Sequence, residues 1–208
     1  MDKLKAYYIK GEHYDWVTAP RRLEKIFHRQ RERETTKVIN KYKKGSLVLD
    51  AGCGTGFITR QLDGCVIGLD INTWNLQQAR KHASSVNFVL GDIENLPVKN
   101  NKLDLVVCTE TLEHLEQPEK AIAELHRVLK SGGRLIGSVP HHHLVWKLRK
   151  FTLTTCPVSE PFHHNYVIPE VKTMLRNFKL VFIHTRLFGL NVFFVAEKLQ
   201  TSAGKIRG

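Results

Sequence analysis

Short runs of consecutive apolar residues alternate with amphipathic segments through the middle of the chain. Five runs typical of buried strands lie at residues 46–50, 65–70, 86–90, 103–108 and 134–139. Helices are predicted between them at residues 57–62, 74–83 and 118–129. Because strands alternate with helices, we expect parallel strands joined by right-handed crossovers, with helices on both faces of one sheet.

The segments on either side extend this pattern. Residues 20–42 are rich in charge with interspersed apolar positions, which predicts one or two amphipathic helices. The glycines of Ser131-Gly132-Gly133 are expected to end the preceding helix. A helix is predicted at 169–177, and strands at 179–185 and 191–198 are close enough in sequence to form an antiparallel pair. The predicted fold is therefore α/β, with a seven-stranded, mostly parallel sheet and a C-terminal antiparallel strand pair.

One domain fits the chain length of 208 residues. We expect residues 1–44 to form an N-terminal helical cap on that domain, which spans 45–200. Within it, the irregular, histidine-rich stretch at about 141–168 is predicted to face the substrate, and residues 201–208 to form a flexible tail.

Charge is unevenly distributed along the chain. The net charge is +12, with +7 in residues 1–44, −2 in residues 45–140 and +7 in residues 141–208. Basic flanks around a near-neutral centre are able to attract an anionic substrate, RNA or a membrane surface. Solubility alone explains them equally well.

Cellular location is predicted from what the sequence does not contain. No apolar run approaches the 20 or so residues that span a bilayer, and the N-terminus lacks a secretory signal pattern. The four cysteines are widely spaced without a C-x-x-C pair, which favours free thiols. We therefore expect a cytoplasmic protein, either a monomer or a homodimer.

Candidate binding chemistry lies at the carboxyl ends of three predicted strands. The segment from Asp50 to Gly56, DAGCGTG, follows the first strand, where glycines let the backbone turn tightly and approach a ligand. Asp70 ends the second strand, in a position to accept hydrogen bonds from ribose hydroxyls. Asp92 and Ile93 follow the third strand, in a position to contact an adenine ring. Together these residues predict an adenosine site.

At these motifs the chain resembles the class I S-adenosylmethionine-dependent methyltransferases, within the type 11 group that includes ubiquinone and menaquinone methyltransferases. The resemblance covers about residues 45–200 and rests on LVLDAGCGTG, GLD, GDIENLPV, LEHL and RVLKSGGRLIGSVP. It implies a Rossmann-like fold and S-adenosylmethionine as cofactor, with S-adenosylhomocysteine as product. The implied cofactor residues are Asp50, Ala51, Gly52, Cys53, Gly54, Gly56, Asp70, Ile71, Asp92, Ile93 and Thr109.

A dinucleotide is the weaker alternative cofactor. The dinucleotide fingerprint G-x-G-x-x-G places its third glycine three residues beyond the second, where this chain has Phe57. The carboxylate of Asp50 would also crowd a pyrophosphate.

Several histidines are candidates for acid–base chemistry, because imidazole exchanges protons near neutral pH. His114 lies in the LEHL run after the fourth strand. In PFHHNYVIPEV, which resembles a substrate-side stretch of the family, His163, His164 and Tyr166 are further candidates. A role in ordering loops is the alternative for each. Similarly, Tyr7, Tyr8, Tyr14 and Trp16 would either cover the site or, the favoured interpretation, anchor the N-terminal segment.

A divalent metal is a further hypothesis. Glu110, Glu113 and His114 have an E-x-x-E-H spacing similar to that of metal-assisted ubiquinone-pathway and small-RNA 2′-O-methyltransferases. A histidine after the fifth strand, such as His141, His142 or His143, would complete a set for magnesium or zinc. Relatives with the same Glu-His pair need no metal.

These observations favour a methyltransferase that acts on a small molecule at oxygen. Anionic and lipid-linked small molecules are among the acceptors that this hypothesis includes. The main alternative is an RNA methyltransferase with metal-assisted 2′-O-methylation, although no RNA-binding module is recognisable. A non-catalytic cofactor-binding protein of the same fold is the third hypothesis.

Overall fold

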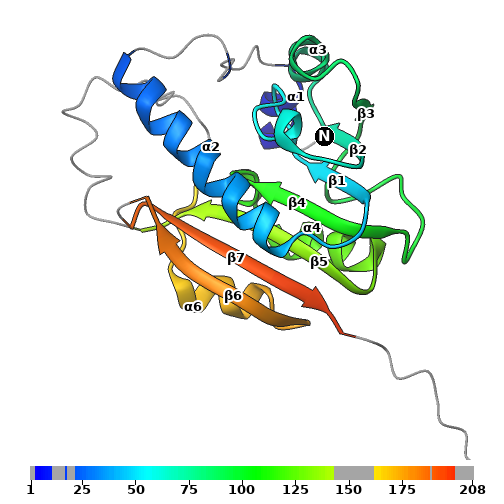
Figure 1. Cartoon of the computed structure of the whole chain (residues 1–208), viewed down its shortest axis with the longest axis vertical. Helices are drawn as coiled ribbons and strands as arrows, with labels where there is room; N and C mark the ends of the chain where they lie inside the picture. Colours follow the sequence, from blue (N-terminus) through cyan, green and yellow to red (C-terminus); the bar gives the residue numbers. More distant parts are fainter. Residues whose placement is uncertain (1–2, 11–16, 18–21, 143–161, 188, 200–208) are drawn as a thin grey trace, which may run out of the picture.

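Seven strands form one sheet at the centre of the computed structural model, which describes residues 3–10, 17, 22–142, 162–187 and 189–199. The sheet order is β3-β2-β1-β4-β5-β7-β6, and only β7 runs antiparallel to its neighbours β5 and β6 (Figure 1). The bounds are β1 Leu47–Ala51, β2 Cys65–Asp70, β3 Asn87–Leu90, β4 Leu103–Thr109, β5 Leu129–Pro140, β6 Phe178–Arg186 and β7 Asn191–Lys198. The predicted mostly parallel sheet with a C-terminal antiparallel pair is confirmed.

Helices cover both faces of this sheet. Helix α2 (Arg22–Tyr42) crosses one face in Figure 1, where its Val38 and Ile39 join a core with strand residues such as Phe193. Helices α4 (Pro118–Val128) and α6 (Ile168–Met174) cover the other, packing Leu125 and Val171 into a second core. Helix α3 (Thr73–His82) lies beside β2 and β3. The central strands β1, β4, β5 and β7 are therefore largely buried, whereas the edge strands β3 and β6 expose part of their residues.

The helix predicted at 57–62 is wrong. The structure has only a 3₁₀ turn, η1 (Thr59–Gln61), after which the backbone becomes extended at Leu62. The buried hydroxyl of Thr59 donates a hydrogen bond to Asp50 at 2.6 Å, which holds this turn against β1. Because Ile58 and Thr59 are also β-branched, their helix propensity is low.

The expected role of Gly132 and Gly133 in ending the helix is wrong as well. Leu129 is already extended and pairs with Leu103, so α4 ends at Val128 and residues 131–133 form an irregularity within β5. At the end of α4, the Lys198 ammonium donates to the carbonyls of His126 and of the following Leu129 at 2.8 Å each. The carbonyls of Arg127 and Val128 accept from the backbone N–H groups of Asn101 and Lys102. A basic side chain thus takes the place of a glycine cap.

Helix α1 (Lys3–Lys10) lies in the stretch expected to form a helical cap, before the helices placed at 20–42, and is near the end of β2 and α3 (Figure 1). Several predictions fall outside the described residues. They concern Tyr14, Trp16, the tail at 201–208 and most of the predicted substrate-facing stretch, residues 143–161.

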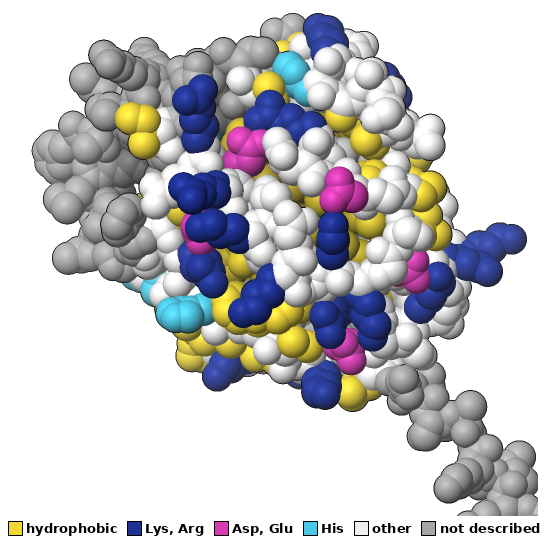
Figure 2. Space-filling model, in the orientation of Figure 1, with side chains coloured by type: hydrophobic (Ala, Val, Ile, Leu, Met, Phe, Trp, Pro, Cys, Tyr) yellow, Lys and Arg dark blue, Asp and Glu magenta, His cyan; other side chains and the backbone are white. Residues whose placement is uncertain are grey.

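Basic side chains are prominent on the face that α2 covers (Figure 2). The exposed ones on and after this helix are Arg29, Arg33, Lys37, Lys41, Lys43 and Lys44. Within the described residues, no helix has the length and apolar character needed to cross a membrane.

Candidate functional site

A cavity of about 610 Å³ opens where the carboxyl ends of the central strands meet. Nine of the eleven predicted cofactor residues line it, namely Asp50, Gly52, Cys53, Gly54, Asp70, Ile71, Asp92, Ile93 and Thr109. The other two do not: Ala51 is fully buried within β1, and Gly56 packs against Ala79 of α3. The parallel topology thus brings three separated motifs to one wall of the cavity.

The glycine turn after β1 leaves room above its backbone. Gly52 and Gly54 both have left-handed backbones, with φ of +76° and +53°. A Cβ on Gly52 would lie 2.4 Å from Thr111, whereas a Cβ on Gly54 would meet nothing within 4 Å. Thr55 lines the same cavity, is 3% exposed, and its Oγ1 has no hydrogen-bond partner among the described residues. This open, polar cradle fits a ligand that approaches the backbone closely.

Asp70 is held in place by the turn that it faces. One carboxylate oxygen accepts a hydrogen bond from the backbone N–H of Gly54 at 2.8 Å. The other accepts from the backbone N–H of Asn72 at 2.9 Å and from Nδ2 of Asn75 at 3.1 Å. Asp70 is only 8% exposed, so its charge is fixed at the cavity wall by three donors.

Asp50 lines the cavity although it is only 2% exposed. Burial raises the pKa of its carboxyl to about 7. The hydrogen bond from Thr59 lowers this pKa, and the nearby charge of Asp70 raises it. A positively charged group in the cavity would therefore favour the ionised form of Asp50.

Helix α1 closes one side of the cavity and binds the third motif. Lys5 Nζ lies 2.7 Å from Asp92 Oδ2 and forms a second ion pair with Glu94. Burial alone would lower the pKa of Lys5, but its hydrogen bonds to Asp92 and Glu94 raise it. Leu4 and Tyr8 also line the cavity. This helix is therefore part of the site and not only an anchor.

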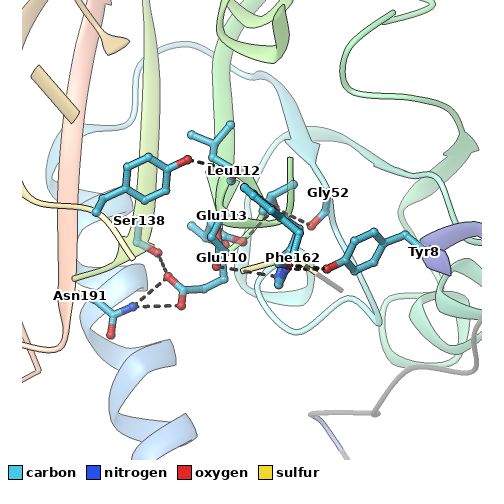
Figure 3. A network of polar contacts seen from close by, with 12 residues as sticks. Tyr8, Gly52, Glu110, Leu112, Glu113, Ser138, Phe162 and Asn191 are labelled. Carbon is cyan, nitrogen blue, oxygen red and sulfur yellow. Dashed lines mark hydrogen bonds and ion pairs between the residues drawn. The ribbon is translucent and has the colours of Figure 1, made fainter. Parts of the chain in front are cut away.

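Tyr8 connects α1 to the histidine side of the cavity. Its hydroxyl lies 3.0 Å from His114 Nδ1 and donates to the carbonyl of Phe162 at 3.3 Å (Figure 3). The carbonyl of Tyr8 accepts from Asn72 Nδ2 at 2.6 Å. The imidazole of His114 is thus oriented by a residue 106 positions away in the sequence.

Two of the four candidate catalytic residues line the cavity. His114 and His163 do so, with ring centroids 5.3 Å apart. His164 is exposed and lies 3.5 Å from Glu170. Tyr166 is 5% exposed and donates its hydroxyl proton to the carbonyl of Leu112 at 3.2 Å. The structure therefore separates His164 and Tyr166 from the cavity lining.

The predicted metal ligands are not assembled into a site. Glu110 is bound to Ser138 and Asn191, His114 to Tyr8, and His141 Nδ1 lies 2.8 Å from the carbonyl of Gly189. Among the described residues, no three His, Cys, Asp or Glu side chains are grouped as metal ligands. Glu110 has a left-handed backbone, with φ of +52°, at the start of the turn that carries Glu113 and His114.

Several cavity residues were not predicted from the sequence. His28, Arg31 and Thr35 of α2 line the cavity, and their spacing of three and four places them on one face of the helix. Ser138 and Asn191 come from the ends of β5 and β7. The i, i+3, i+7 spacing of the three α2 residues was the sequence feature from which their common helix face could have been predicted.

Known proteins are similar in sequence to the central region of this chain. The family model described as a methyltransferase domain, of type 11, matches residues 49–137. The malonyl-[acyl-carrier protein] O-methyltransferase of Hamiltonella defensa is 38% identical over 98 residues, which are 46% of this chain and 38% of that protein. The ubiquinone biosynthesis O-methyltransferase of Coxiella burnetii is 33% identical over 102 residues, 46% of this chain and 44% of that protein. The matched region thus spans less than half the length of either relative.

Solved structures share the fold. The magnesium protoporphyrin IX methyltransferase from Synechocystis PCC 6803, solved with bound SAH, aligns with a TM-score of 0.67 and 21% identity over 93% of each chain. Residues 49–137 thus match a type 11 methyltransferase domain, and the seven-stranded sheet around them has the fold of solved S-adenosylmethionine-dependent methyltransferases.

Proposed function

We propose that the protein transfers a methyl group from S-adenosylmethionine to an oxygen atom of a small-molecule acceptor. One observation carries the proposal: a single cavity contains both the glycine and aspartate wall and the His114 wall. The two relatives named as O-methyltransferases support transfer to oxygen. Because they are matched over less than half their length, their own acceptors are not carried over.

The residues that would hold the cofactor follow from the geometry of the wall. Asp70 would accept hydrogen bonds from the ribose hydroxyls, and Asp92 with Ile93 would contact the adenine. Asp50 and the turn through Gly54 would hold the methionine portion, which carries a positive ammonium group. The bound sulfonium supplies an activated methyl group, so the protein's task is mainly to align the acceptor with it.

His114 is the residue we assign to remove the acceptor proton. The Tyr8 hydroxyl has one proton and donates it to the Phe162 carbonyl. We therefore assign a proton to Nδ1 of His114, which donates it to the Tyr8 oxygen. In the neutral ring this leaves Nε2 as the proton acceptor. Glu113 Oε1 lies 4.0 Å from Nε2 and would stabilise the imidazolium that forms.

Replacing His114 with alanine is expected to lower kcat by roughly 100-fold or more, because a positioned general base contributes at least about that factor. Binding of S-adenosylhomocysteine should change little. His184→Ala, at an exposed position of strand β6 outside the cavity lining, is the matched control and should retain activity. The measurement is transfer of labelled methyl groups to a small-molecule extract and, separately, to total RNA. Label found in RNA alone would contradict the small-molecule acceptor.

The two left-handed glycines are expected to respond differently to alanine. Gly52→Ala should lower the free energy of unfolding by roughly 2–5 kcal/mol, since it combines backbone strain with overlap onto Thr111. Gly54→Ala meets no atom and should cost only about 1–2 kcal/mol of backbone strain. Its methyl group would instead occupy cofactor space and weaken S-adenosylhomocysteine binding by roughly tenfold or more. Urea unfolding and calorimetry separate the two effects, and unchanged affinity in Gly54→Ala would remove Gly54 from the site.

A further inference from the structure

Glu110 has an unusual backbone for its residue type. It is the first residue after β4 and has φ of +52°, in the left-handed region that disfavours residues with a Cβ. Its backbone N–H donates to the carbonyl of Ser138 at 2.9 Å, and its side chain accepts from Ser138 Oγ at 2.8 Å (Figure 3). Strained conformations of this kind persist where surrounding contacts enforce them and concentrate at functional sites.

Asn191 completes the arrangement from the neighbouring strand β7. Its Nδ2 donates to both carboxylate oxygens of Glu110, at 2.9 and 3.0 Å (Figure 3). Asn191 is 1% exposed and lines the cavity, yet its Oδ1 has no hydrogen-bond partner among the described residues. Buried polar atoms nearly always have a partner. Oδ1 is therefore an acceptor atom suited to a proton from a bound molecule.

The position of this pair in the sheet separates it from the cofactor wall. Glu110 follows β4, Ser138 lies near the end of β5 and Asn191 begins β7. The aspartates that would hold the cofactor lie instead at the ends of β1 and β2 and just after β3. Both groups line the same cavity. The pair thus lies on the side of the cavity left for the acceptor.

The charges of the lining indicate which chemical group fits. Although the chain carries +12, the cavity is lined by more acidic than basic side chains. The acidic ones are Asp50, Asp70, Asp92, Glu94, Glu110, Glu113 and Glu116, and the basic ones are Lys5, Arg31 and Lys120. Arg31 lies 3.5 Å from Glu110 and offsets part of its charge. Hydrogen-bond donors suit this lining better than an anionic group.

We infer that Glu110 and Asn191 form an acceptor subsite that binds a hydroxyl or amino group of the substrate by accepting its protons. The inference rests on the proposed methyl transfer, because it names what that site recognises. Glu110 and Asn191 are specificity-determining in this account, with Ser138 positioning Glu110.

Phenol and anisole are the probes, since they differ in a single donor hydrogen. Ligand-observed NMR would be run on the protein saturated with S-adenosylhomocysteine and on the protein without it. In both cases phenol should bind roughly tenfold more tightly than anisole, because one buried hydrogen bond changes affinity by about that factor. Benzoate should bind more weakly than phenol. Equal affinity for phenol and anisole, or no measurable phenol binding, would overturn the inference.

Glu110→Gly and Glu110→Asn provide the matching variants, because glycine and asparagine tolerate a left-handed backbone. Both should abolish the preference for phenol over anisole while binding of S-adenosylhomocysteine is retained. Asn101→Gly relieves a similar φ of +55° outside the cavity and should keep the preference. If the preference survives in both Glu110 variants, the subsite is wrong. Failure of all three proteins and the wild type to bind S-adenosylhomocysteine would instead overturn the proposed function.

Discussion

Asp70→Ala is expected to weaken binding of S-adenosylhomocysteine by roughly 10- to 100-fold. The buried carboxylate is fixed by the N–H groups of Gly54 and Asn72 and by the Asn75 amide, so its removal deprives ribose hydroxyls of partners that are already oriented. Loss of a charged hydrogen-bond partner in a buried site costs about 1.5–3 kcal/mol, which corresponds to this range. Isothermal calorimetry on the purified protein measures the change directly.

Asp63→Ala is the matched control, because it removes a carboxylate from the same part of the chain. Asp63 is 76% exposed at its side chain and pairs with Lys43 at 2.9 Å, outside the cavity. Its affinity for S-adenosylhomocysteine should equal that of the wild type. Equal affinities for the wild type and Asp70→Ala would exclude Asp70 from binding the ribose.

The buried Asp50 should make the protein less stable as pH rises. Its pKa in the folded state is about 7, raised chiefly by burial, whereas an unfolded aspartate ionises near its ordinary value of 3.8. Between these two values the folded state holds a proton that the unfolded state has released, so the free energy of unfolding falls with rising pH. A shift of this size corresponds to a loss of up to roughly 4 kcal/mol, complete above about pH 7.

Asp50→Asn should remove this dependence, because the amide oxygen still accepts from Thr59 and carries no charge. The variant is expected to be more stable than the wild type at pH 8, with the difference disappearing toward pH 4. Asp104→Asn is a control of opposite sign, since hydrogen bonds from Lys130 and the Leu47 backbone lower the pKa of Asp104. That variant should lose stability near neutral pH and approach the wild type in acid. Denaturant unfolding across this pH range tests both, and parallel wild-type and Asp50→Asn curves would contradict the assignment.

The sequence predicted the parts of the site that depend on strand ends. Asp50, Asp70 and Asp92 could be placed together because the carboxyl ends of parallel strands meet at one edge, and the structure puts all three on the cavity wall. The fold class could be predicted for a similar reason, since apolar runs between amphipathic segments specify an α/β sheet. Both inferences start from local sequence patterns, and the parallel sheet then places the residues of those patterns next to one another.

The features that could not be predicted depend on contacts between distant segments. Tyr8 meets His114 across 106 positions, and Lys198 of the last strand donates to a carbonyl in the last turn of α4, so neither contact leaves a local pattern. Glu110 was proposed as a metal ligand from its spacing to His114, and that spacing gives no sign of its left-handed backbone or of its hydrogen bond from Asn191. Tertiary contacts set the direction of the side chain at such a residue, and the spacing of residues along the sequence gives no information about those contacts.

Calorimetric titration with S-adenosylhomocysteine tests the central claim most directly. The account predicts saturable binding at one site per chain, weakened in Asp70→Ala and unaffected in Asp63→Ala, with no comparable binding of NAD. Repeating the titration with a chelator and with added magnesium or zinc shows whether a metal contributes to this binding. Absence of S-adenosylhomocysteine binding by the wild-type protein, or tighter binding of NAD, would contradict the assignment of the cavity.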